Sequence, residues 1–132
     1  MLIKKYILVA FLLNICSGQN WVQNQRTEKL FKEAVSTYNS GRYATTETIL
    51  NKIIDLNYKS FNEKSLLLLL KSQVALNKSD FAKQTAKTFF SKYPRSPFLK
   101  HAMESIGDLF VNNSNYESAY KMYVRSKNLS NN

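Results

Sequence analysis

The residues best suited to chemistry in this chain are its single histidine and two carboxylates near it. His101, Glu104 and Asp108 stand at i, i+3 and i+7, which would place all three on one face of a helix. Imidazole and carboxylate groups can bind a metal ion, but one helix rarely supplies a whole site, and no second cluster of His, Cys or paired carboxylates follows. We favour an exposed polar stripe over a metal site, and we expect no cofactor.

Other signals of enzyme chemistry are weak. The sequence contains no Gly-rich phosphate loop and no Gly-x-Ser-x-Gly nucleophile elbow, and its few carboxylates are scattered. The tyrosines recur at helical spacing, which is more typical of a packed core than of platforms for nucleic-acid bases. We therefore expect a protein that is not an enzyme and does not bind nucleic acid.

The N-terminus has the three parts of a secretory signal. Lys4 and Lys5 give a positive start, ILVAFLL at 7–13 is a short apolar core, and small residues precede a cleavage position before Gln19. The apolar run is much shorter than the roughly 20 residues that a membrane-spanning helix needs. We therefore expect residues 1–18 to be a signal peptide and the protein to be exported.

The only cysteine, Cys16, lies at the end of this segment and leaves a second possibility open. The stretch Leu13-Asn14-Ile15-Cys16 partly resembles a bacterial lipobox, whose cysteine is lipidated, although Ile15 stands where a small residue is usual. Without lipidation, cleavage leaves a chain with no cysteine, so its stability must come from packing rather than from disulfides.

Composition and charge favour a helical, basic protein. With 132 residues the chain has room for one domain, and 44% hydrophobic residues suffice for a core. Gly 3 and Pro 2 leave few breaks, which favours long helices. The charge is +10, from 19 basic and 9 acidic residues; without two lysines of the signal it would be 17 − 9 = +8. Such a balance favours anionic surfaces, although lysines scattered singly can also serve solubility alone.

Hydrophobic periodicity predicts three pairs of amphipathic helices. The predicted pairs span about 27–59, 60–95 and 96–128, between a polar lead-in at 19–26 and a polar tail at 129–132. In the third pair the expected apolar stripes are Ile106, Phe110 and Val111, then Tyr116, Ala119, Tyr120 and Tyr123. The five leucines at 66–70 predict a central helix that its neighbours cover on most sides.

Turn and capping signals separate these helices. Ser40-Gly41 breaks the first pair, because glycine tolerates the left-handed conformation at a helix end. The stretches 60–63 and 114–117 have the capping-box pattern, in which a serine caps the helix and a glutamate three residues later binds back. Ser79 is a further expected N-cap. Ser96-Pro97 predicts an N-cap followed by proline at the first helical position.

An aromatic residue recurs where each second helix is expected to open. Tyr43, Phe81 and Tyr116 are 38 and 35 residues apart, and a two-helix period near 34 is typical of tetratricopeptide (TPR) repeats. The third pair resembles this family position by position through Gly107, Phe110, Tyr116, Ala119 and Tyr123. In the first pair, Ala34, Gly41, Tyr43 and Leu50 match, but Thr46 stands where alanine is usual. The second pair fits two registers, one favoured by Phe81 and the other by Ala82 and Pro94.

The resemblance implies an all-α, right-handed α-solenoid of about three repeats. The junction Tyr93-Pro94-Arg95-Ser96-Pro97, together with the signal sequence, is similar to exported bacterial repeat proteins of the BamD-like and Tol-Pal accessory (CpoB-like) type. That similarity implies protein binding in a concave groove at a cell envelope; peripheral binding of an anionic polymer or membrane is the alternative. The expected groove residues are either partner contacts or merely solvated. They are Glu28, Phe31, Val35, Tyr38, Lys71, His101, Glu104, Asp108 and Asn112.

Overall fold

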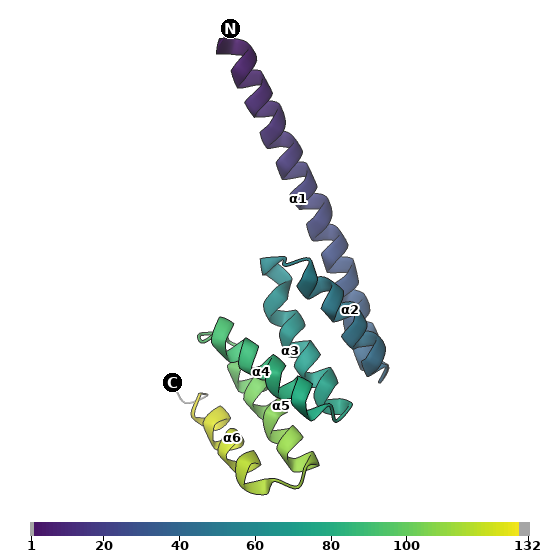
Figure 1. Cartoon of the computed structure of the whole chain (residues 1–132), viewed down its shortest axis with the longest axis vertical. Helices are drawn as coiled ribbons and strands as arrows, with labels where there is room; N and C mark the ends of the chain where they lie inside the picture. The colour runs from purple at the N-terminus through teal and green to yellow at the C-terminus, as the bar shows by residue number, and fades with distance from the viewer. Residues whose placement is uncertain (1, 130–132) are drawn as a thin grey trace.

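The computed structural model describes the backbone of residues 2–129 and the side chains of residues 20–129, and the described chain is all-helical. The expectation of an all-α protein is confirmed. Six helices follow one another without a strand between residues 2 and 129 (Figure 1). They are α1 (Leu2–Asn39), α2 (Tyr43–Asp55), α3 (Lys59–Ala75), α4 (Ser79–Lys92), α5 (Leu99–Asn112) and α6 (Tyr116–Asn128).

Helix α1 is longer than the sequence pattern suggested, because the polar stretch 19–26 continues the helix instead of preceding it. Its N-terminal half extends away from the other five helices (Figure 1). The Tyr58 hydroxyl donates a hydrogen bond of 2.7 Å to the backbone oxygen of Asn20, near the point where α1 joins the bundle. The predicted signal peptide and Cys16 lie outside the residues whose side chains the structure describes. Among the described residues, no helix has the length and apolar content needed to cross a membrane.

Three of the connections between helices share one backbone geometry. A residue with positive φ stands two positions before the next helix in α1–α2, α3–α4 and α5–α6, at Gly41 (72°), Asn77 (52°) and Ser114 (57°), and also in α2–α3, at Asn57 (51°). In α1–α2, α3–α4 and α5–α6 the backbone N–H after this residue bonds a carbonyl five residues earlier, at 2.8 to 2.9 Å, whereas the described residues of α2–α3 make no such bond. The three turns with this bond are Schellman turns, and their equal form divides the bundle into three helix pairs.

The equal turns also fix which positions of the three pairs correspond. Since the second helices start at Tyr43, Ser79 and Tyr116, their fourth residues Thr46, Ala82 and Ala119 are equivalent, and all three are buried. The expectation that Phe81 opens its helix as an equivalent of Tyr43 is wrong. Phe81 lies two residues inside α4 and is 65% exposed. In the second pair Ala82 marks the correct register.

Thr46, which corresponds to Ala82 and Ala119 of the other pairs, is polar and faces another threonine. Its hydroxyl lies 2.9 Å from that of Thr37 on α1, and both side chains are buried. Each hydroxyl also has a backbone carbonyl within reach, that of Arg42 for Thr46 and that of Ala34 for Thr37. A threonine therefore fits where alanine is usual, since its polar atom is satisfied inside the helix contact.

Both predicted capping boxes are wrong. Ser114 adopts the left-handed conformation of the preceding turn, so Asn115 becomes the N-cap of α6 and its side chain accepts from the Ser118 backbone N–H at 3.2 Å. Helix α3 begins at Lys59, and its N-cap Tyr58 makes no side-chain capping bond. The serine of the first predicted box, Ser60, therefore lies inside the first helical turn. The turns that precede α3 and α6 therefore determine the residue at which each helix begins.

Two further predicted caps shift by one or two residues. Ser79 is the first residue of α4, and Lys78 holds the N-cap position. Ser96 does bind a backbone amide, since its Oγ accepts from the Phe98 N–H at 2.9 Å, but α5 starts at Leu99 and not at Pro97. A short turn bonded from the Leu99 N–H to the Ser96 oxygen at 3.2 Å intervenes.

The core consists of two clusters that meet at α3. Its leucines divide between them: Leu69 belongs to the cluster with α1 and α2, whereas Leu66 and Leu70 belong to the cluster with α4 and α5. Leu67 and Leu68 are only half-buried. The predicted central helix is thus covered on several sides, and its remaining side stays partly open.

In the third pair, the residues that are buried are only partly those of the expected apolar stripes. Leu109 is completely buried where the pattern favoured its neighbours, and Val111 is 40% exposed. Tyr116 and Tyr120 are also exposed, at 66% and 70%. Only Ala119 and half-buried Tyr123 of the second stripe pack against α5, because in the described part of the chain α6 has a neighbouring helix on one side only.

Candidate protein-binding groove

A hollow lies between the first helices of the three pairs. Seven residues from α1, α3 and the turn before α5 line an open hollow of about 210 Å³, which we call the groove hollow. They are Phe31, Val35, Lys64, Leu67, Leu68, Lys71 and Phe98. The Phe31 ring also packs on Phe61, with 5.8 Å between ring centroids, which supports the wall on the side of α1.

Three of the residues expected in the groove line this hollow: Phe31, Val35 and Lys71. Lys64, Leu67, Leu68 and Phe98 were missed. The turn geometry makes Lys64 and Leu67 equivalent to Glu28 and Phe31, so counting back from Asn77 instead of Phe81 would have found them. Phe98 precedes its helix, and only the turn at 96–99 brings it to the hollow.

Two lysines border the apolar walls of the groove hollow. Lys64 and Lys71 lie seven residues apart on α3, on one face of the helix. Among the side chains that the structure describes, neither amino group lies within ion-pair distance of a carboxylate. The hollow therefore combines an apolar surface with two positive charges.

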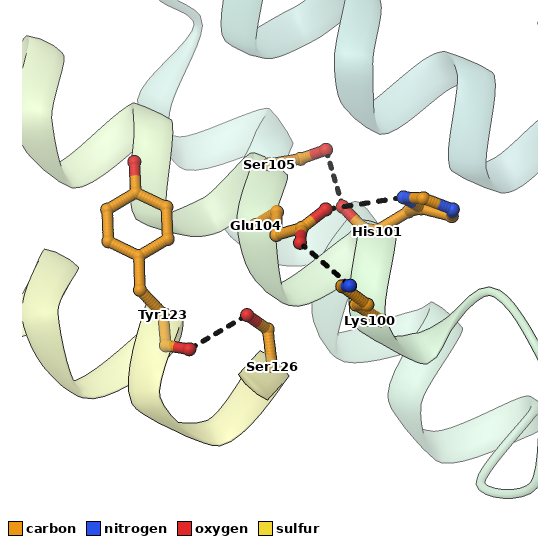
Figure 2. Close-up of polar contacts among 6 residues, drawn as sticks. All are labelled: Lys100, His101, Glu104, Ser105, Tyr123 and Ser126. Atoms are coloured by element: carbon orange, nitrogen blue, oxygen red, sulfur yellow. Dashed lines mark hydrogen bonds and ion pairs between the residues drawn. The ribbon is translucent and has the colours of Figure 1, made fainter. Parts of the chain in front are cut away.

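The expected residues on α5 form a separate, acidic part of the surface. The Glu104 carboxylate lies 3.3 Å from His101 Nδ1 and 4.0 Å from Lys100 Nζ (Figure 2). Asp108, one turn further, accepts a hydrogen bond of 2.6 Å from the Tyr123 hydroxyl of α6. Asn112 is exposed at the last position of α5.

This arrangement does not gather the three groups of α5 around one point. Glu104 is engaged by His101, whereas Asp108 turns to Tyr123. Within the described side chains, no group of three or more His, Cys, Asp or Glu residues has a geometry that could hold a metal ion. The described surface here is a charged stripe of hydrogen bonds and ion pairs.

Tyr123 joins α6 to this stripe through an unusually close contact. A Cβ added to Gly107 would lie 2.6 Å from Tyr123 Cε1, so the ring rests directly on the glycine backbone. Burial, followed by the hydrogen bond and negative charge of Asp108 and the charge of Glu104, together raise the pKa of Tyr123 to about 12. Gly107 thus positions the ring that holds Asp108.

On α1, the expected groove residues Tyr38 and Glu28 have local partners. The Tyr38 ring packs edge-on against Tyr43, with 5.3 Å between centroids. Burial raises the pKa of Tyr38, and the nearby Tyr43 and Asp108 raise it further, so Asp108 acts on α1 as well as on α6. Glu28 forms an exposed ion pair of 2.7 Å with Lys32.

Comparisons with known proteins do not assign this chain to a family. No family model, no curated protein and no solved structure matches the chain.

Proposed function

We propose that the chain is a non-enzymatic protein-interaction module, in which a right-handed α-solenoid of about three TPR-like helix pairs binds a segment of a partner protein. The observation that carries the proposal is the groove hollow, where α1 and α3 join an apolar surface to Lys64 and Lys71. Its walls come from packed helices, so the surface is formed before a partner arrives.

The dimensions of the groove hollow favour a peptide over a small molecule. About 210 Å³ lies below the roughly 300–1,000 Å³ of typical small-molecule sites, but it accommodates an apolar side chain that anchors a longer segment. Lys64 and Lys71 favour carboxylates next to that anchor, whereas Glu104 and Asp108 favour a basic residue further along. The fitting partner is therefore an apolar segment with acidic and basic flanks.

The setting we propose is the periphery of a bacterial cell envelope, in the periplasm or at the outer membrane. The support is the export signal expected at residues 1–18 and the resemblance to BamD-like and CpoB-like repeat proteins. A scaffold in outer-membrane assembly or in Tol-Pal-type maintenance would fit a groove without catalytic groups.

A pull-down from envelope extract with the full chain tests this proposal. Val35→Asp places a charge in the hollow at a side chain that is already 36% exposed, so the fold should persist while the partner is lost. Phe81→Asp is the matched control, because Phe81 is exposed and lies outside the groove hollow. Equal recovery of partners by the parent and by Val35→Asp would contradict the groove as the binding site.

A second candidate function is peripheral binding of an anionic polymer or membrane through a basic face. Lys83 and Lys87, one turn apart on α4, line a second hollow of about 280 Å³ together with Ala86, Phe90 and Ile106. Lysines beside apolar side chains suit an anionic surface with an apolar boundary.

A pair of equal charge reversals distinguishes the two functions. Lys71→Glu and Lys83→Glu each change the net charge by the same amount, so a difference between them reports which of the two surfaces binds. Groove binding should weaken in Lys71→Glu alone and should persist at high salt better than surface attraction. A larger loss in Lys83→Glu than in Lys71→Glu, with release of all partners by salt, would favour the basic face.

A further inference from the structure

The two lysines of the groove hollow carry charge that the described side chains do not neutralise. Lys64 and Lys71 lie on one face of α3, and Lys71 is half-buried. Neither amino group forms an ion pair with a carboxylate among the side chains that the structure describes. Apolar neighbours lower the local dielectric, so a carboxylate brought by a ligand is attracted more strongly here than at a fully exposed lysine.

The three acidic residues expected in the groove are engaged elsewhere. Glu28 pairs at 2.7 Å with a lysine one turn later on α1. Glu104 lies 3.3 Å from His101 Nδ1, and Asp108 accepts a hydrogen bond of 2.6 Å from α6. Each of these carboxylates has a partner other than the lysines of α3, which therefore remain for the carboxylates of a ligand.

The rest of the groove hollow is apolar and has room for one anchor. Besides the two lysines, its lining consists of two phenylalanines, two leucines and a valine. A volume of about 210 Å³ accommodates one large apolar side chain such as leucine or phenylalanine. Burial of that side chain supplies affinity in proportion to the apolar area that it removes from water.

The spacing of the two lysines suits an extended segment. Seven residues at about 1.5 Å each put the backbone of Lys64 about 10 Å from that of Lys71. In an extended segment alternate side chains point the same way, so acidic residues two positions before and two positions after the anchor lie about 13 Å apart on its side. Two flexible lysine side chains can span that difference. A helical partner would need acidic residues seven positions apart, and it would bring further apolar positions to a hollow that holds one.

We propose that the groove hollow binds an internal, extended segment with the pattern acidic–x–apolar–x–acidic, in which the apolar residue is leucine or phenylalanine. This inference rests on the proposed function, because it names the partner chemistry of the same groove. Charge complementarity decides the flanks, since carboxylates meet Lys64 and Lys71, whereas basic flanks would face like charges. The basic residue that Glu104 and Asp108 favour lies outside this five-residue core.

Isothermal titration calorimetry of the full chain with a synthetic peptide tests the proposal. The probe is Glu-Ser-Phe-Ser-Glu between further serines, with both ends blocked so that its two glutamates supply the only carboxylates. Lys64→Glu and Lys71→Glu should each weaken binding about three- to tenfold, because each loses an attraction and gains a repulsion. Lys52→Glu is the matched control, since it changes the net charge equally from an exposed position on α2 outside the hollow. Far-UV circular dichroism checks that each variant keeps its helices.

Two further sets of peptides test the charge pattern and the spacing. Lys-Ser-Phe-Ser-Lys should bind the parent more weakly than the acidic probe, and it should bind the double variant Lys64→Glu/Lys71→Glu more tightly than it binds the parent. Peptides with the glutamates one or four positions from the phenylalanine should bind more weakly than the probe. An acidic probe that binds no tighter than the basic peptide, binding that ignores the spacing, or equal losses in Lys52→Glu and Lys71→Glu would overturn the proposal.

The pull-down with Val35→Asp separates this inference from the proposed function. If Val35→Asp loses the partner while the peptides show no preference for acidic flanks, the groove remains a binding site and only the partner chemistry is refuted. If Val35→Asp recovers partners as the parent does, the groove itself is refuted as the binding site.

Discussion

Alanine at Gly107 should destabilise the parent protein but stabilise a variant that lacks the Tyr123 ring. The new Cβ would lie 2.6 Å from Tyr123 Cε1 and 2.9 Å from Cζ, so the ring must move. Moving it also breaks the 2.6 Å hydrogen bond from Tyr123 to Asp108. In Tyr123→Ala neither cost arises, and only the higher helix propensity of alanine remains.

The sizes of these contributions decide whether Gly107→Ala destabilises or stabilises the protein in each background. Overpacking costs about 1–3 kcal/mol, and the partly exposed hydrogen bond contributes about 0.5–1 kcal/mol. Alanine in place of glycine inside a helix offsets about 1 kcal/mol of this. We therefore expect Gly107→Ala to lower the free energy of unfolding by about 1–2 kcal/mol in the parent, and to raise it by about 1 kcal/mol in Tyr123→Ala. Gly107→Leu should cost more in the parent, because a branched side chain needs still more room.

Urea unfolding of the four proteins, followed by circular dichroism, measures this cycle. The expected coupling between the two positions is about 2–3 kcal/mol, well above the roughly 0.5 kcal/mol found between independent sites. An unchanged denaturant slope would show that the compared states are the same. If Gly107→Ala had the same effect in both backgrounds, the close contact between Gly107 and Tyr123 would be refuted.

Three further outcomes follow from single contacts. The pKa of Tyr123 is raised from 10.0 to about 12, so the stabilisation that the protonated Tyr123 hydroxyl contributes should be complete below pH 10.0 and lost as the pH rises through about 12. Asp108→Asn should shift the titration of this phenol, followed by absorbance, to lower pH. Glu47→Gln should destabilise the protein by about 0.5–1 kcal/mol in thermal melts at low salt, and clearly less at high salt, because its partner lysine is partly exposed. Thr46→Val should cost about 1 kcal/mol in urea unfolding, since it removes a buried hydroxyl contact; a more stable variant would contradict that role.

The apolar periodicity was sufficient to predict an all-helical chain and the approximate place of most helices. Burial of a periodic face is a local property, so a pattern such as that of Leu66 and Leu70 indicates a covered helix without knowledge of its neighbours. The close approach at Gly107 was also predictable, because a glycine inside a helix costs stability unless the packing needs it.

The candidate groove was predictable only in part, and the reason is the register of the second pair. Phe81 and Ala82 offered competing alignments, and aromatic character alone favoured the wrong one. Ala82 is completely buried in a helix contact, whereas Phe81 is exposed, and nothing in the local pattern distinguishes them. Because the register stayed open, only Lys71 of the second pair was predicted for the groove, and Lys64 was missed.

The sequence by itself determined the helical class, the basic charge and the residue types available for a groove, because each depends on composition or on spacing along one helix. Only the tertiary structure decided which face of each helix is exposed, since that depends on helices distant in the sequence. Tyr120 and Glu47 illustrate the difference. Both occupy the same position of their pairs, but Glu47 bonds the next pair while Tyr120 remains 70% exposed, because only Glu47 is followed by another helix pair in the described fold.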